Sequence, residues 1–164
     1  MVKRIIVYYS LEGNIEYIAD KLADALKAEK LKLIPQKAYA DKGFAKFFWG
    51  GKSAVMAEIP ALESYKLDAD YDEFIIGFPV WAGNIMPPIR TFIFENKEML
   101  EGKRISVFAC QSGSGAEKAF EKLKKLLGID AFYDTVVFID PKSKPSVKND
   151  KKLEAFIRAL SNEG

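Results

Sequence analysis

A short segment near the amino end has the residue types and spacing to bind an anion. It consists of Ser10, Leu11, Glu12, Gly13, Asn14 and Ile15. It follows an apolar run that ends at Tyr9, and a helical pattern of apolar residues begins at its far end. The first N–H groups of a helix lack internal partners and lie at the positive end of the helix dipole, so they favour a phosphate. The chemistry predicted for this segment is phosphate binding.

The composition excludes several other kinds of site. The chain has no histidine and a single cysteine, Cys110, so imidazole acid–base chemistry, the usual zinc sites and an internal disulfide are excluded. Redox or transfer chemistry must therefore come from a bound organic group or from carboxylates. The formal net charge of +2 is too small to indicate a nucleic acid partner.

The length of the chain and its first residues indicate the number of domains and the cellular location. A chain of 164 residues can bury a full core, and we expect a single domain over residues 1–164. The apolar run after Lys3 and Arg4 is too short for a signal peptide or a membrane span. We therefore expect a cytoplasmic protein without a membrane partner.

Apolar runs at residues 3–9, 31–34, 73–78, 104–110 and 131–139 predict five strands. Most of these runs lack a clean polar alternation, which is typical of parallel strands that are covered on both faces. Helical patterns occur at residues 16–28, 87–96, 116–127 and 147–160. Alternating strands and helices predict an α/β fold, a doubly wound parallel sheet with helices on both faces.

In open parallel sheets, ligands bind beyond the carboxyl ends of the strands. Three loops follow predicted strands at that edge, at residues 10–15, 79–86 and 111–115. The first has one glycine where a dinucleotide fold needs G-x-G-x-x-G, and the P-loop pattern is absent. A receiver domain would have acidic residues after the first strand and an aspartate ending the third, but this chain has Tyr9-Ser10 and Phe78-Pro79. These three classes are excluded.

The first strand and its loop resemble the flavodoxin signature, which has an apolar pair, an aromatic residue, a hydroxyl residue and then glycine and alanine at set spacing. The matching residues are Ile6, Val7, Tyr8, Ser10, Gly13, Ala19 and Leu22. Residues 71–81, the helix start at residues 87–90 and Phe92 are similar to the same family. The likeness covers essentially the whole chain and has no insertion in the last strand. It implies a short-chain, flavodoxin-like fold with strand order 2-1-3-4-5.

The resemblance further implies FMN as the cofactor, with residues 10–15 around its phosphate. Trp81 would stack on the isoalloxazine ring, and the third loop would flank its pyrimidine side. Beyond the phosphate segment, the implied cofactor residues are Pro79, Val80, Trp81, Ala82, Gly83, Asn84, Gln111, Ser112, Gly113, Ser114 and Gly115. No catalytic residue and no metal ligand is implied. Stacking of an aromatic residue on a nucleobase is worth about 1–3 kcal/mol, which guides the expectation for Trp81.

The chain departs from the family pattern in the phosphate segment, where Glu12 and Ile15 stand in place of threonines. A carboxylate about 6 Å from one phosphate charge would cost roughly 3 kcal/mol at an effective dielectric constant near 20. We therefore expect Glu12 to point into solvent. Backbone amides, helped at most by Ser10, would then hold the phosphate.

Two features leave alternatives open for the second face of the flavin. The third loop has no aromatic residue, where electron-carrying members often place a tyrosine. The aromatic block in residues 39–65 contains Phe44, Phe48 and Trp49, and it reads either as an amphipathic helix on the sheet or as a segment that reaches the ligand or a partner. The flavin face is then either open to a substrate or covered by this block.

The leading functional expectation is an FMN-dependent one-electron carrier between redox proteins, monomeric or weakly dimeric. The alternative is an NAD(P)H-dependent flavin or quinone reductase that passes electrons to a small acceptor. A third class is a binding domain that has lost its flavin, favoured only by Glu12 and Ile15. In the first two classes the cofactor carries out the chemistry and the protein tunes it.

Overall fold

The strands form one parallel sheet of order β2-β1-β3-β4-β5, as the resemblance implied. The computed structural model describes residues 1–36 and 59–162. The strands are β1 (Arg4–Tyr8), β2 (Glu29–Lys32), β3 (Glu73–Pro79), β4 (Arg104–Gln111) and β5 (Thr135–Ile139). The helices are α1 (Asn14–Leu26), α4 (Pro87–Glu95), α5 (Lys97–Leu100), α6 (Ala116–Leu127) and α7 (Val147–Ser161).

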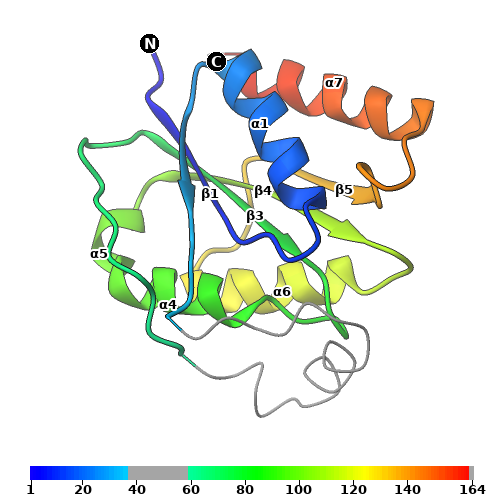
Figure 1. Cartoon of the computed structure of the whole chain (residues 1–164). Helices are drawn as coiled ribbons and strands as arrows, with labels where there is room; N and C mark the ends of the chain where they lie inside the picture. The colour runs from blue at the N-terminus through cyan, green and yellow to red at the C-terminus, as the bar shows by residue number, and fades with distance from the viewer. Residues whose placement is uncertain (37–58, 163–164) are drawn as a thin grey trace.

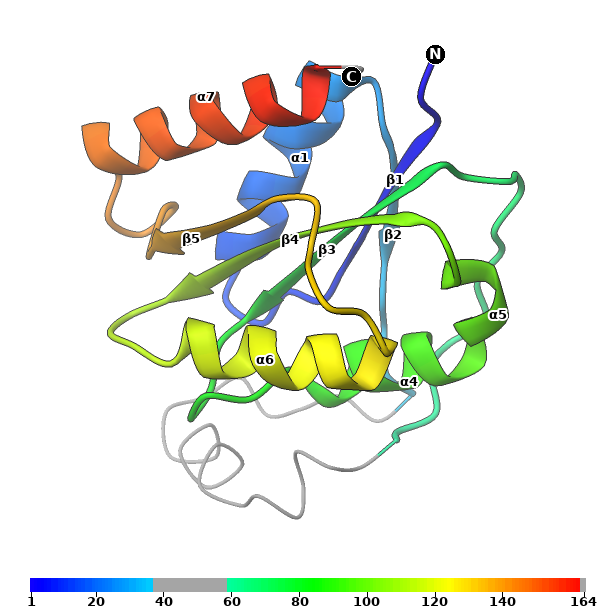
Figure 2. The ribbon, with the colours of Figure 1, turned by 180° about the vertical axis from the view of Figure 1, so that it is seen from behind.

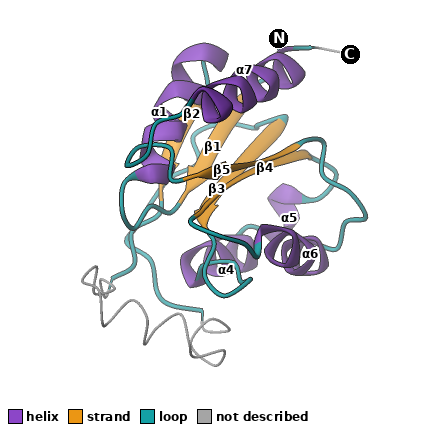
Figure 3. Ribbon diagram, turned by 90° about the vertical axis from the view of Figure 1, so that its right-hand side faces the viewer, coloured by secondary structure: helices purple, strands orange, loops and turns teal. Residues whose placement is uncertain are grey.

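The sheet is the middle of three layers, with α1 and α7 on one face and α4 and α6 on the other (Figures 1 and 3). Successive residues of a strand point to opposite faces, and both sets are apolar. In β1, Ile5 and Val7 pack in the core beneath α4 and α6. Ile6 and Tyr8 pack in the second core, beneath α1 and α7. Burial on both faces explains why the central strands read as continuous apolar runs.

The predicted boundaries are wrong mainly at the edge strands. The strand predicted at residues 31–34 is observed as Glu29–Lys32, because pairing with β1 sets its register, Ile5 opposite Glu29. Leu33 is buried but lies just beyond the strand. The last strand begins at Thr135 instead of residue 131. Edge strands pair on one side only, so apolar content is a weaker guide to their limits.

The helix boundaries differ less. Helix α1 starts at Asn14, two residues before the predicted start. The short helix α5 was not predicted, and it follows Asn96, whose side-chain amide donates to the Phe92 carbonyl at 2.8 Å. Helix α6 ends at Leu127 and is followed by Gly128 with φ 71°, which confirms the glycine predicted after its last turn.

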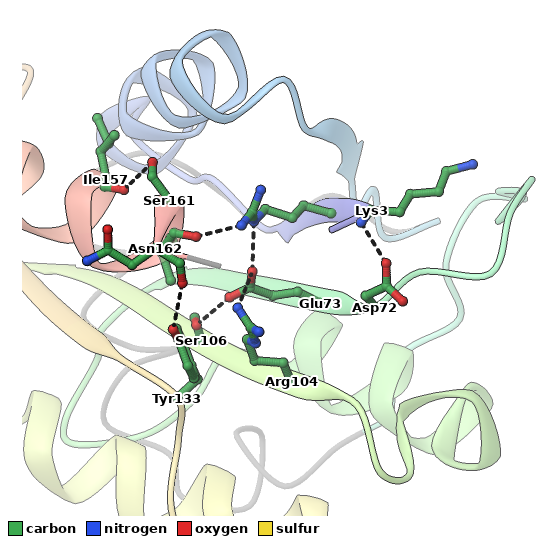
Figure 4. Close-up of polar contacts among 11 residues, drawn as sticks. Lys3, Asp72, Glu73, Arg104, Ser106, Tyr133, Ile157, Ser161 and Asn162 are labelled. Atoms are coloured by element: carbon green, nitrogen blue, oxygen red, sulfur yellow. Dashed lines mark hydrogen bonds and ion pairs between the residues drawn. The ribbon is translucent and has the colours of Figure 1, made fainter. Parts of the chain in front are cut away.

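A buried polar network lies at the amino ends of β1, β3 and β4 (Figure 4). The Glu73 side chain is fully buried; it accepts from Arg4 Nε at 2.9 Å and from the Ser106 hydroxyl at 2.8 Å. Arg4 Nη2 also donates to the Leu160 carbonyl, in the last turn of α7, at 2.5 Å. A second guanidinium atom, Arg104 Nη1, lies 4.0 Å from the Glu73 carboxylate. The network ties the sheet to the end of α7.

No helix in the described ranges is long and apolar enough to cross a membrane.

Candidate functional site

A pocket that is open to solvent lies at the carboxyl edge of the sheet. Its walls come from the loops after β1, β3, β4 and β5. The lining residues are Leu11, Glu12, Asn14, Ile15, Pro79, Val80, Trp81, Cys110, Gln111, Ser112 and Asp140. Figure 2 shows the arrowheads of β4 and β5 on the same side of the molecule as the start of α1. The three loops singled out from the sequence therefore meet in one place.

The loop after β1 lines this pocket and leads into the first turn of α1. Gly13 adopts φ 94°, a conformation that glycine tolerates, and α1 begins directly after it. The Glu16 N–H donates to the Ser10 hydroxyl oxygen at 3.2 Å, which leaves the hydroxyl proton available. No acceptor for the N–H groups of Asn14 and Ile15 is found in the described part of the chain. The loop can therefore offer two amides and one hydroxyl to an anion.

Glu12 lies on the pocket wall with an exposed side chain. Exposure lets water screen its charge and lets the side chain rotate away from a phosphate. The expectation that its carboxylate faces solvent beside a bound phosphate stays a prediction.

Trp81 lines the pocket and begins a tight turn. The Asn84 N–H donates to the Trp81 carbonyl at 2.9 Å, and the two central residues, Ala82 and Gly83, have φ 50° and 69°. Positive φ at both central positions is typical of a type I′ turn. The Asn84 side chain donates to the Ala82 carbonyl at 3.0 Å and accepts from the Lys122 ammonium. These contacts hold the turn that presents the half-buried indole.

The third loop is braced against the start of α6 and against Asp140, which follows β5. The Gln111 side-chain oxygen accepts from the Ala116 N–H at 3.0 Å and so caps the start of α6. The Ser112 hydroxyl donates to the Asp140 carboxylate at 2.9 Å. Because these partners are internal, the first amides of α6 are less available to a ligand than those of α1.

Gly115 sits where the third loop meets the tryptophan turn. It has φ 109°, and a Cβ on it would lie 3.1 Å from the backbone N and Cα of Gly83. The two loops can therefore approach this closely only with glycine at residue 115. Gly113 and Ser114 are exposed and lie outside the pocket wall.

The structure adds residues that the sequence reading did not place at the site. Asp140 and Cys110 line the pocket, and Asp140 adopts φ 41°. Burial, and secondarily the Asp140 carboxylate, raise the pKa of the Cys110 thiol, which stays protonated as expected for a structural cysteine. One signal in the sequence could have indicated Asp140. The last predicted strand ends at residue 139, and its carboxyl end lies at the same edge of the sheet as the pocket.

Two further expectations concern metal ligands and the aromatic block. No group of three or more acidic or cysteine side chains that could hold a metal occurs among residues 1–36 and 59–162. Phe44, Phe48 and Trp49 of the aromatic block lie outside the described residues. Neither interpretation of that block is tested.

Comparison with known proteins identifies the family. The flavodoxin family model matches residues 3–154. Among solved structures, a candidate flavoprotein from Bacteroides eggerthii is 23% identical with a TM-score of 0.75, covering 98% of each chain. A Lactobacillus acidophilus flavoprotein crystallised with FMN is 20% identical with a TM-score of 0.66, covering 93% of this chain and 99% of that one. Oxidised flavodoxin 2 from Bacillus cereus is 18% identical with a TM-score of 0.58, covering 99% of both. This chain belongs to the flavodoxin family.

Proposed function

We propose that the chain binds FMN in the pocket at the carboxyl edge and carries electrons singly between redox proteins. The observation that supports this most is the meeting of free helix-start amides with an accessible indole in one pocket. An amide cluster suits the phosphate, and the indole offers a flat surface to the ring system. Membership of the flavodoxin family supports the same cofactor.

One set of pocket residues would contact the phosphate of FMN, and a second set would contact its ring system. The amides of Asn14 and Ile15 and the Ser10 hydroxyl would hold the phosphate, because these donors lack other acceptors. Trp81 would lie against the isoalloxazine ring, with the turn at residues 82–84 and the loop at residues 112–115 around its edge. FMN itself accepts and releases the electrons, and the protein positions the cofactor and tunes its potential.

One observation favours the reductase as a second candidate. Trp81 is the sole aromatic residue that lines the pocket in the described part of the chain. One face of the bound ring would then remain open to a nicotinamide or a quinone, unless the aromatic block covers it. The carrier and the reductase differ in whether NADPH reduces the flavin directly.

Reconstitution and anaerobic titration separate these functions. The purified chain is loaded with FMN, titrated with dithionite and then challenged with NADPH and a quinone. For a carrier, we expect two resolved one-electron steps in the absorption spectrum and no NADPH oxidation. Rapid NADPH oxidation that requires the loaded protein would assign the reductase instead. Failure to retain FMN would contradict both functions and support the binding domain without flavin.

Trp81→Ala is expected to weaken FMN binding by about tenfold, because the loss of stacking costs about 1–3 kcal/mol. Fluorescence titration of the apoprotein with FMN measures the change. Trp81→Phe keeps a ring and should retain most of the affinity. Phe94→Ala, which removes a 70% exposed ring on α4, is the control for loss of an aromatic side chain outside the pocket. An unchanged FMN affinity in Trp81→Ala would remove this residue from the ring contact.

Gly115→Ala is expected to weaken FMN binding by roughly thirtyfold. An alanine at φ 109° is strained by about 1–3 kcal/mol, and its Cβ pushes against the Gly83 backbone. The strain is relieved when the third loop moves away from the tryptophan turn. Gly113→Ala is the control in the same loop, because its Cβ would meet nothing within 4 Å. Equal FMN affinity in the two variants would show that the close approach of the loops does not shape the site.

A further inference from the structure

Lys142, in the loop between β5 and α7, lies over the phosphate segment. Its ammonium nitrogen is 3.0 Å, and its Cδ 3.4 Å, from the position that a Cβ on Gly13 would occupy. The lysine side chain therefore fills the space that opens above Gly13 because this residue has no side chain. Residues far apart in the sequence are brought together here by the parallel sheet.

The backbone of this loop is fixed to the start of α1. The buried side-chain oxygen of Asn14 accepts from the Lys142 N–H at 2.9 Å and from the Ser143 N–H at 3.4 Å. At its other end the loop turns back on itself, since the Lys144 N–H donates to the Asp140 carbonyl at 2.7 Å. Asn14, a pocket residue whose backbone N–H has no acceptor in the described part of the chain, thus also sets the position of Lys142.

The charged side chains near Lys142 leave its ammonium available to a bound anion. The other lysine of the loop, Lys144, has its ammonium 3.7 Å from the Asp140 carboxylate. Lys142 forms no ion pair with any side chain in the described ranges. The phosphate segment itself contributes one charge, the carboxylate of Glu12, and it repels a phosphate.

We propose that Lys142 supplies the positive charge that neutralises the FMN phosphate. The proposal rests on FMN binding at this site. An ammonium beside a phosphate forms a charge-assisted hydrogen bond, which is stronger than a bond between neutral groups. Lys142 thereby takes the place of the hydroxyl donors that Glu12 and Ile15 do not provide. Asn14 is the positioning residue that holds the lysine in reach.

The test compares two flavins that differ only in the phosphate. The apoprotein is titrated with FMN and with riboflavin, and binding is followed by quenching of flavin fluorescence. Lys142→Met removes the charge but keeps most of the side-chain length, and Lys142→Arg keeps the charge. Lys148→Met, at an exposed residue in the first turn of α7, is the control for losing one positive charge from the chain. Circular dichroism and thermal unfolding confirm that each variant is folded.

We expect Lys142→Met to lose about tenfold in FMN affinity and to leave riboflavin affinity unchanged. Lys142→Arg and Lys148→Met should stay within about twofold of the parent. The difference between the parent and Lys142→Met should shrink as salt is raised, because exposed charges are screened.

The outcomes separate this proposal from the proposed function. If the parent binds FMN and Lys142→Met binds it equally well, the role of Lys142 is wrong but FMN binding stands. If Lys142→Met weakens FMN and riboflavin equally, the lysine does not act through the phosphate, and the proposal is overturned. If the parent binds neither flavin, both proposals fail.

Discussion

Arg4→Met is expected to lower the free energy of unfolding by about 3–5 kcal/mol, because it leaves the buried Glu73 carboxylate without its ion-pair partner. The side chains of Arg4 and Glu73 are 7% and 0% exposed, so water cannot replace the lost contact. Arg104 does not compensate, since its Nη1 is 4.0 Å away and has no hydrogen-bond partner among the described residues. The variant also loses the bond to the Leu160 carbonyl, so the end of α7 should loosen from the sheet. Urea unfolding of the apoprotein measures the effect.

Two further variants identify the cause. Lys3→Met removes one positive charge from the adjacent, exposed position; its ammonium lies 5.7 Å from the centre of the Tyr71 ring, so the change should cost no more than about 1 kcal/mol. Arg4→Met combined with Glu73→Met replaces the whole ion pair by apolar side chains and should recover most of the loss. If the single variant Arg4→Met is as stable as the parent, Glu73 is not held by this pair. If the double variant stays as unstable as Arg4→Met, the loss is one of packing and not of charge.

Gly77→Ala is expected to destabilise the fold by about 3 kcal/mol, the upper end of the usual range for overpacking. A Cβ at this residue would lie 2.2 Å from Cζ of the Phe108 ring, which stands opposite it on β4. Both residues are in central strands, and the Phe108 side chain is fully buried, so the ring has no free space to move into. Thermal and urea unfolding of the apoprotein give the change.

A double-mutant cycle tests whether this contact is responsible. In a Phe108→Leu background the ring edge is gone, so Gly77→Ala should cost much less there than in the parent. Gly113→Ala, which has open space around its Cβ, should be close to neutral for apoprotein stability. An equal cost of Gly77→Ala in both backgrounds would mean that the Phe108 ring is not what excludes a side chain at residue 77.

The fold could be predicted because its signals are local or repeat along the chain. Apolar runs without polar alternation marked β1, β3 and β4, and their burial on both faces is what removes the alternation. The edge strands were placed less well, because the backbone partner on one side sets their limits. The loops after β1 and β3 were also located, since a glycine and a tryptophan after an apolar run are visible in the sequence.

The sequence by itself determined the alternation of strands with the longer helices, the loop at residues 10–15 before the first helix and the position of Trp81 after the third strand, because each depends on residues near one another in the chain. Only the tertiary structure decided that Glu73 is buried against Arg4, that Gly77 makes room for Phe108 and that Lys142 lies over Gly13. These pairs are separated by between 31 and 129 residues, and their contact follows from the register and order of the parallel strands. No local pattern encodes such contacts, because the type of a charged residue or a glycine does not indicate which distant residue lies opposite it in the folded chain.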